Sequence, residues 1–429
     1  MSRIILHVDL NAFFVRCEEI KNPSLINKPV AVGGTGRKGI VSTCSYKARS
    51  YGIHSGMPMF QAQALCKELI ILPCDFKYYN LMSREFVHHL KQFTPLVEQA
   101  SIDECYMDIT ESFKKYGNNN INEYLKNIQV GLYNKTKLYC SIGVASTKFL
   151  AKMGSDIKKP NGITIIRKKD IPSIIFPLPI KDYYGIGNKT YPKLQNIGIN
   201  TIGDLYYRIK KNDPNDLLNN YLMNFKENII LCLEGKSDDK LNLNDFDPKS
   251  IGRTTTFDYD SDNIDFIKNM ILSQASIIID EMKNKNKVCK TIQLVYKEGG
   301  QDSDFKTKTF AKSFNEFSDD KEFITKKISQ FIDETYDFTL LRMAGVTLKN
   351  LKDKEKLDVQ MTFDNYEKYE SESKVQLLIN DLNRKANKDL FFSGSKLKER
   401  KNGDKWGIWK IFTILYVWKT TYKCNYYWL

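Results

Sequence analysis

Residues 101–109 constrain this chain more than any other stretch, because Asp103 and Glu104 stand side by side in an otherwise strand-like run. Their apolar and aromatic neighbours favour a pleated, half-buried surface, where an unpaired carboxylate is costly and two adjacent ones repel each other. A bound metal ion removes both penalties. Neighbours on a regular strand point to opposite faces, so the two acids can share an ion only at a strand end, turn or bulge. The alternative is a pair of solvated acids at the end of a strand.

A second strand-like run, residues 3–9, also ends on an acid, Asp9. If the two runs meet, Asp9, Asp103 and Glu104 form a cluster of oxygen ligands. Oxygen-only ligation suits a hard cation such as Mg²⁺, which also accepts the phosphates of a substrate as ligands. Two such ions a few ångströms apart can activate an attacking hydroxyl and stabilise a leaving oxygen in phosphoryl transfer. The sequence therefore predicts a two-metal phosphoryl-transfer site.

Tyr46 and Arg49 lie three residues apart in a helix-like segment, which places them on one helical face. The Arg fork can hold phosphate oxygens in pairs, and the Tyr hydroxyl adds a neutral donor. Thr43, at the end of the preceding strand, can donate a third contact. The alternative for Arg49 is a solvated charge on a helix surface.

Four motifs follow one another along the chain: HVDLNAFF at residues 7–14, SYKAR at 45–49, SIDE at 101–104 and KKPNG at 158–162. In this order and at this spacing they resemble the Y family of translesion DNA polymerases, and most of all its bacterial DNA polymerase IV branch. The resemblance spans about residues 3–350. It implies an α+β, multidomain right-hand polymerase with a palm, small fingers and a helix-hairpin-helix thumb, plus a β-α-β-β-α-β little-finger domain.

The resemblance also implies roles for individual residues. Asp9, Asp103 and Glu104 would be catalytic and would hold two Mg²⁺ ions, together with the backbone carbonyl of Leu10. The side chains expected to bind the triphosphate of the incoming nucleotide are Thr43, Tyr46, Arg49 and Lys152. Phe14 would be the steric gate, whose ring fills the space of a ribose 2′-hydroxyl; a buried core phenylalanine is the alternative. Position 11 is Asn, where many relatives have Asp, and it is not among the implied ligands.

The expected domains follow from the same resemblance. They are the palm at residues 1–10 and 76–165, the fingers at 11–75, the thumb at 166–235, a linker at 236–249, the little finger at 250–349 and a C-terminal extension at 350–429. In the thumb, residues 184–189 and 196–201 resemble a helix-hairpin-helix. Gly185, Gly187 and Lys189 are the expected DNA contacts, because glycines let backbone amides approach a phosphodiester. A tight helical turn without a ligand is the alternative.

The formal net charge is +14, and residues 111–165 alone carry nine basic and three acidic side chains. Such local excess is expected where a face meets a polyanion, although Lys is also abundant throughout the chain. The nine cysteines contain no Cys-x-x-Cys pair and predict no zinc site. An odd number of scattered cysteines predicts reduced thiols in a protein of the cytoplasm, and no apolar run is long enough to cross a bilayer. We also expect a monomer.

The C-terminal extension departs from the family. Gln360-Met361-Thr362-Phe363 resembles a sliding-clamp-binding peptide with one residue missing. All four tryptophans fall in the last 24 residues, beside an apolar run at 411–418. This tail is either a lineage-specific extension that docks on a partner or membrane surface, or a segment added by reading past the natural end of the gene.

These expectations combine into one predicted activity. The primer 3′-hydroxyl attacks the α-phosphorus of a dNTP paired with a DNA template, and pyrophosphate leaves. A small fingers lobe and the lack of a second acidic constellation for proofreading predict low fidelity and translesion synthesis. Two alternatives remain at this point: a catalytically silent DNA-binding scaffold of the same fold, and a nucleotidyl cyclase.

Overall fold

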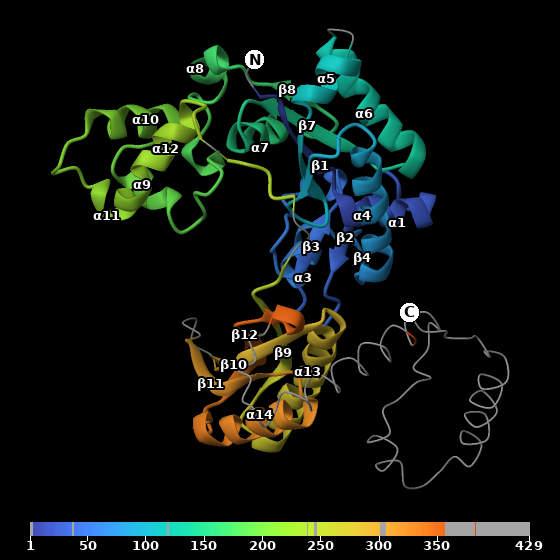
Figure 1. Ribbon diagram of the computed structural model, residues 1–429, viewed down its shortest axis with the longest axis vertical. Helices are drawn as coiled ribbons and strands as arrows, with labels where there is room; N and C mark the ends of the chain where they lie inside the picture. Colours follow the sequence, from blue (N-terminus) through green and yellow to red (C-terminus); the bar gives the residue numbers. More distant parts are fainter. Residues whose placement is uncertain are drawn as a thin grey trace, which may run out of the picture. The chain divides into compact units, whose positions relative to one another are not determined.

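The computed structural model describes residues 3–356, apart from short gaps at 37, 118–119, 238, 244–246 and 301–305, together with Leu382. Three separate sheets organise this part of the chain (Figure 1). The predicted clamp peptide and the tryptophan-rich tail lie outside the described residues. Within the described part, no helix combines the length and the apolar character that crossing a membrane requires.

The first sheet has five strands in the order β5-β6-β1-β7-β8. Its elements are β1 (Ile5–Leu10), α1 (Phe13–Lys21), α4 (Phe76–Lys91), β5 (Val97–Gln99), β6 (Glu104–Asp108), α5 (Thr110–Tyr116), α6 (Ile121–Thr136), β7 (Cys140–Ala145), α7 (Lys148–Ile157) and β8 (Ile163–Ile165). Successive side chains of β1 point to opposite faces of the sheet, so its apolar residues enter two different cores. Leu6 and Val8 join the core formed with α4 and α6, whereas Ile5 joins the core formed with α7.

Helix α7 lies on the opposite side of the sheet from α4 and α6 (Figure 1). By the same alternation, His7 and Asp9 share the α7 face with Ile5. The Thr147 hydroxyl accepts from the Leu150 N–H and so caps the N-terminus of α7. The strand β1 therefore presents Asp9, its last residue but one, to α7.

A small lobe is inserted between α1 and α4. It contains η1 (Pro23–Leu25), β2 (Val30–Gly33), β3 (Val41–Cys44), α2 (Tyr46–Arg49), α3 (Met59–Leu65) and β4 (Ile70–Leu72), with strands in the order β3-β2-β4. The Ser45 hydroxyl accepts from the Ala48 N–H, so the short helix α2 begins directly after β3. This fixes Tyr46 and Arg49 close to the end of that strand.

A helical lobe follows β8, and its core continues that of the α7 face. It contains η2 (Lys168–Asp170), α8 (Ile171–Ile174), η3 (Ile180–Asp182), α9 (Tyr191–Asn196), α10 (Ile202–Lys211), α11 (Asn219–Leu222), η4 (Met223–Phe225) and α12 (Lys226–Leu233). Thr201 and Asp204 form a reciprocal capping box at the start of α10.

The third sheet has its own core and runs β11-β10-β12-β9. In chain order its elements are β9 (Ser250–Ser261), α13 (Ile264–Asn284), β10 (Lys287–Glu298), β11 (Thr307–Ser318), α14 (Lys321–Thr335) and β12 (Leu341–Lys349). The short β13 (Lys352–Asp353) and η5 (Lys354–Lys356) end the described run. The predicted β-α-β-β-α-β order is therefore confirmed, as is the α+β class.

Candidate functional site

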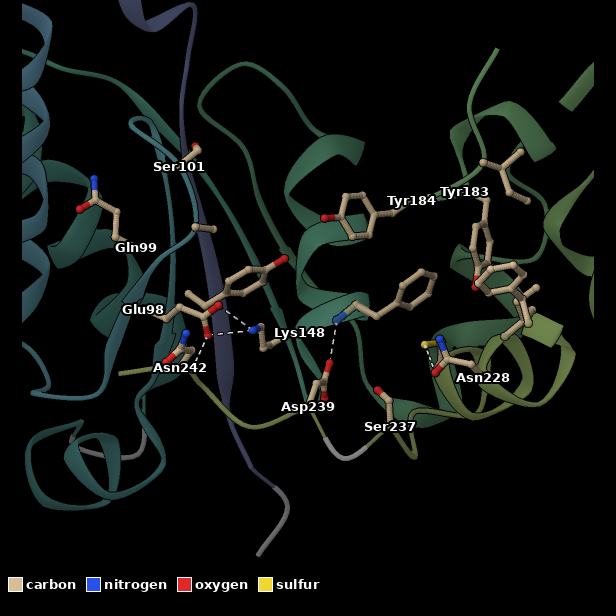
Figure 2. A pocket seen from close by; sticks show the side chains of 18 of the residues that line it. Glu98, Gln99, Ser101, Lys148, Tyr183, Tyr184, Asn228, Ser237, Asp239 and Asn242 are labelled. Atoms are coloured by element: carbon tan, nitrogen blue, oxygen red, sulfur yellow. Dashed lines mark hydrogen bonds and ion pairs between the residues drawn. The ribbon is translucent and has the colours of Figure 1, made fainter. Parts of the chain in front are cut away.

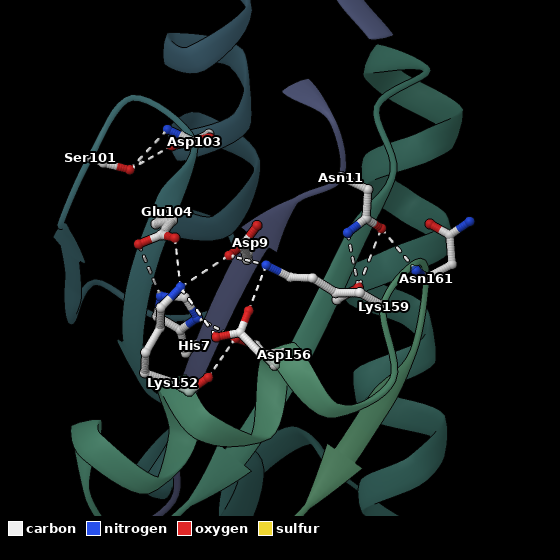
Figure 3. A network of polar contacts seen from close by, with 12 residues as sticks. His7, Asp9, Asn11, Ser101, Asp103, Glu104, Lys152, Asp156, Lys159 and Asn161 are labelled. Carbon is white, nitrogen blue, oxygen red and sulfur yellow. Dashed lines mark hydrogen bonds and ion pairs between the residues drawn. The ribbon is translucent and has the colours of Figure 1, made fainter. Parts of the chain in front are cut away.

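The register of the first sheet places two of the three predicted acids, Asp9 and Glu104, opposite each other. Asp9 pairs directly with Glu104 across the antiparallel strands β1 and β6, so their side chains share the α7 face. From α7, the Lys152 Nζ reaches both carboxylates, at 3.2 Å from Asp9 Oδ2 and 2.6 Å from Glu104 Oε1 (Figure 3). Both oxygens contact one nitrogen, so the two carboxylates share one cation, the Lys152 ammonium.

Asp103 precedes β6 by one residue, and its carboxylate points elsewhere. Its backbone carbonyl accepts from the Leu10 N–H at 3.0 Å, while its Oδ1 accepts from the Ser101 hydroxyl at 2.7 Å (Figure 3). Among the residues that the structure describes, no three His, Cys, Asp or Glu side chains are gathered in a metal-binding arrangement. The structure thus brings Asp9 and Glu104 together and leaves Asp103 beside them, at the wall of the same pocket.

Burial and neighbouring charges shift the pKa values of both carboxylates and of Lys152. Burial raises the pKa of Asp9 to about 6, against the lowering effect of Lys159 and Lys152. Burial also acts to raise the pKa of Glu104, but its polar neighbours, with His7 Nε2 at 3.6 Å and the hydrogen-bonded Lys152 ammonium foremost, together outweigh it and leave that pKa well below its usual range. Burial acts to lower the pKa of Lys152, but the neighbouring carboxylates of Asp9, Glu104 and Asp156 together outweigh it, so this pKa is raised.

This donor set fits a hard divalent cation. Asp9 is only 5 % exposed, and its oxygen contacts two ammonium groups, Lys152 and Lys159. Buried acids that need this much positive charge nearby are suited to Mg²⁺, which binds carboxylate oxygens and keeps positions for water and phosphate. The residues that offer oxygens are Asp9, Glu104, Asp103 and the Leu10 carbonyl, all of which line one pocket.

That pocket has a volume of about 220 Å³ and joins the end of β1 to the small lobe. Its lining residues are Asp9, Leu10, Asn11, Ala12, Phe13, Phe14, Ser42, Thr43, Tyr46, Arg49, Ser55, Asp103, Glu104 and Lys159. The predicted nucleotide contacts Thr43, Tyr46 and Arg49 therefore face the predicted metal ligands. The Arg49 guanidinium lies 4.7 Å from the Tyr46 ring centroid, which holds the two side chains together. Phe14 lines the same pocket.

Lys152 is the exception among the predicted nucleotide contacts. It is 8 % exposed, sits between the carboxylates and is not part of the pocket lining. Lys159, in contrast, lines the pocket with Tyr46 and Arg49, and its Nζ lies 2.7 Å from Asp9 Oδ2. Sequence reasoning assigned Lys159 no role, although it belongs to the KKPNG motif. The KKPNG motif could have pointed to Lys159, because a lysine in the loop after a helix can reach a site that a lysine within the helix does not.

The predicted DNA contacts lie on the helical lobe, away from this pocket. Gly185, Gly187 and Lys189 are exposed, and Gly185 has a left-handed φ of 106°. Gly185 lines a larger groove of about 1200 Å³ between the helical lobe and the first sheet, which also includes Ser101 (Figure 2). On its floor, Lys148 pairs with Glu98 at 2.7 Å, and Glu98 accepts from the Asn242 N–H at 2.7 Å.

Comparison with known proteins agrees with this geometry. Three family profiles match: the impB/mucB/samB family over residues 8–156, its helix-hairpin-helix motif over 168–199 and its C-terminal domain over 248–363. The chain is 34 % identical to DNA polymerase IV of Bacillus velezensis over 411 residues, which is 94 % of this chain and 95 % of the relative. It is also 34 % identical to DNA polymerase IV 1 of Bacillus subtilis over 407 residues, with 94 % and 95 % coverage.

Solved structures match as well. A chimera of the Y-family DNA polymerases Dbh and Dpo4 superposes with a TM-score of 0.69 at 27 % identity, covering 81 % of this chain and 98 % of the chimera. DinB from Sulfolobus solfataricus gives 0.56 at 26 % identity with the same coverage. The chain belongs to the impB/mucB/samB family, the Y family of DNA polymerases. Within that family it is similar over nearly its whole length to DNA polymerase IV, and the predicted activity, template-directed translesion DNA synthesis, is confirmed at this level.

Proposed function

We propose that the pocket between β1, β6 and the small lobe is the polymerase active site, and that Asp9, Asp103, Glu104 and the Leu10 carbonyl hold two Mg²⁺ ions there. The observation that carries this proposal is the direct pairing of Asp9 with Glu104, on the side of the pocket that faces Tyr46 and Arg49. When bound, the ions supply Lewis acidity to the attacking and leaving oxygens of an in-line displacement. Asp103 would have to give up its hydrogen bond from the Ser101 hydroxyl to take part.

The triphosphate of the dNTP is held by Tyr46, Arg49 and Lys159, with Thr43 as a further donor. Arg49 offers a planar fork of N–H groups, and Lys159 a mobile point charge. Both are at the pocket wall opposite or beside the carboxylates. Lys159 would leave Asp9 when the metal and nucleotide arrive, so the same cation neutralises the acid first and the phosphates afterwards. Lys152 stays with Asp9 and Glu104 and keeps the two carboxylates together.

Phe14 is the steric gate in this proposal, because its ring borders the pocket only five residues after Asp9. A ring fixed at that wall leaves no room for one more hydroxyl on the sugar. Deoxynucleotides are then selected over ribonucleotides by shape, without a hydrogen bond to the sugar.

We assign the first sheet with the helices α4 to α7 (residues 1–10 and 76–165) to the palm, and α1 together with the small lobe (11–75) to the fingers. The helical lobe (166–235) is the thumb, residues 236–249 are the linker, and residues 250–349 are the little finger. Primed DNA would run along the groove that Gly185 and Ser101 line. Gly185, Gly187 and Lys189 would contact its phosphates without reading sequence.

The remaining partners are proposed on sequence grounds. The peptide Gln360-Met361-Thr362-Phe363 would bind the sliding clamp, and the enzyme would act as a monomer in the cytoplasm. A pull-down of the clamp with the intact chain, compared with a Phe363→Ala variant, tests the first of these.

Primer extension tests the active-site proposal directly. A labelled primer on a longer template is incubated with the protein, Mg²⁺ and each dNTP in turn. The expected result is addition of the templated nucleotide, no addition when Mg²⁺ is chelated, and no shortening of the primer in the absence of dNTP. Extension that continues undiminished in an Asp9→Ala variant would overturn the assignment of the site.

A further inference from the structure

The backbone of Asn161 is held from both sides by buried side-chain amides. Its N–H donates to Asn11 Oδ1 at 2.8 Å, and its carbonyl accepts from Gln129 Nε2 at 2.9 Å. Asn11 is 5 % exposed and Gln129 is 9 % exposed, although they come from the end of β1 and the middle of α6. We call Asn11 and Gln129 the amide clamp. Figure 3 shows Asn11 beside Asn161, next to Lys159.

The orientation of both amides follows from their partners. A backbone N–H can only donate, so Asn11 must present its oxygen to Asn161 and its Nδ2 to the Ser141 hydroxyl, at 3.0 Å. Gln129 Nε2 faces a second carbonyl, that of Cys140, at 2.8 Å. A flipped Gln129 amide would place oxygen against oxygen, and a flipped Asn11 amide would place its N–H groups against the Asn161 N–H, so neither side chain has an equivalent alternative.

These contacts tie the loop after α7 to the strands that carry the site. Ser141 and Cys140 lie on β7, where Ser141 pairs directly with Asp9 of β1. Asn161 itself has a left-handed φ of 61°, a conformation that Asn tolerates but that needs support from its surroundings. The clamp supplies that support, because breaking either contact leaves a backbone group of Asn161 without its side-chain partner.

Lys159 lies two residues before Asn161 on this loop. Its side chain is long and flexible, and holding its ammonium at one point costs conformational entropy. Anchoring the backbone next to it reduces that cost, because only the side chain is then left to order. We propose that the amide clamp of Asn11 and Gln129 is a positioning device for Lys159, which sets the affinity of the polymerase for the triphosphate of the incoming nucleotide. This inference rests on the proposed role of Lys159.

The hydrogen bonds of the clamp explain why Asn suits position 11. Asp in its place would keep the acceptor for the Asn161 N–H and for the Ser141 hydroxyl, whose Oγ lies 3.3 Å from Asn11 Oδ1, but it would lose the N–H that donates to Ser141. It would also add a second buried negative charge near Lys159, in competition with Asp9 and with phosphate. An amide avoids this competition and leaves the ammonium available to the nucleotide.

A double-mutant cycle tests the clamp with the full-length protein bound to primed DNA. Gln129→Met keeps length and helix preference but removes both donors, and Asn11→Ala removes the other half of the clamp. Lys159→Ala removes the group that is positioned. Asn127→Ala, an exposed residue on the same helix, is the matched control. Dissociation constants for a non-hydrolysable dNTP come from isothermal titration calorimetry, and KM and kcat come from single-nucleotide extension.

Each clamp variant is expected to weaken dNTP binding and raise KM by about 5- to 20-fold while kcat changes less, as for loss of a positioned binding group. In the Lys159→Ala background the same substitutions are expected to have less than about a twofold further effect, because coupled residues are not additive. Effects that multiply in that background, or clamp variants that bind dNTP like Asn127→Ala, overturn the inference. If Asn11→Ala does not fold, Gln129→Met alone completes the cycle.

The cycle separates this inference from the proposed function. A Lys159→Ala protein with unchanged dNTP affinity would refute the role of Lys159 and the clamp together. A weakened Lys159→Ala protein beside unaffected clamp variants would refute the clamp alone.

Discussion

Phe14 stacks on Tyr79: their ring centroids are 4.4 Å apart and their planes differ by 13°. Phe76 meets the Phe14 ring edge-on at 5.7 Å, and the Tyr79 hydroxyl donates to Glu18 at 2.6 Å. Residues from α1 and α4 thus fix the ring that borders the pocket. A steric gate needs this rigidity, because a ring that swings away excludes nothing.

Replacing Phe14 by Ala is expected to lower the selectivity for dNTP over rNTP by about 10- to 100-fold. This range corresponds to the free-energy cost of fitting one extra group into a packed space. Selectivity is measured as the ratio of kcat/KM values in single-nucleotide extension. Tyr79→Phe keeps the stacked ring and should keep the selectivity. Phe60→Ala, at a side chain that is 63 % exposed, is the surface control. Unchanged sugar selectivity in Phe14→Ala would reject the gate.

Joint replacement of Asp103 and Glu104 by Ala is expected to slow primer extension by about 1000-fold or more, because the metal ligands stabilise charge in the transition state. Affinity for primed DNA, measured by fluorescence anisotropy, should remain, since phosphate contacts lie elsewhere. Glu111→Ala removes an acid whose side chain is 79 % exposed and should extend primers normally. Rapid extension by the double variant would contradict the two-metal assignment.

The raised pKa of Asp9 predicts how stability depends on pH. Its value is about 6 in the folded protein against an ordinary 3.8, so the native state binds the extra proton between these limits. The free energy of unfolding should therefore fall as pH rises from about 4 to about 6, by on the order of 2 kcal/mol for this group.

Asp9→Asn lacks that ionisation. Without metal, its Tm relative to wild type should rise across the same pH window and stay level above it, as measured by calorimetric scans. Saturating Mg²⁺ should stabilise the wild type and not the variant. A Tm difference that does not vary with pH would show that burial of this charge is not costly.

Lys152→Met is expected to destabilise the metal-free protein by about 2–4 kcal/mol, because the buried Asp9 carboxylate and the half-buried Glu104 carboxylate lose a shared cation. Added Mg²⁺ should restore most of the lost Tm. Lys135→Met breaks a longer surface pair, 3.8 Å from Glu85, and should cost less than about 1 kcal/mol. Equal stability of the Lys152 variant and wild type without metal would refute the bridging role.

Much of the fold was predictable, for reasons that lie in short stretches of chain. A short run of strand-forming apolar residues marks the strand that carries Asp9, and the β-α-β-β-α-β order of residues 250–349 was expected from the resemblance to the Y family. The acids and the Tyr46–Arg49 pair were found because phosphoryl chemistry requires particular side chains at close spacing.

Sequence alone determined which residue types this protein brings to phosphate chemistry, since a contiguous motif carries that information. Only the tertiary structure decided which lysine reaches the pocket and which stays behind the carboxylates. Lys152 lies within α7, whereas Lys159 follows the end of that helix at Ile157. Their positions depend on the pairing of β1 with β6 and β7 and on where the loop after α7 is anchored. Asn11 shows the same principle: its partners, Ser141 and Asn161, are about 130 and 150 residues away, and only packing of strand against strand brings them within hydrogen-bond distance.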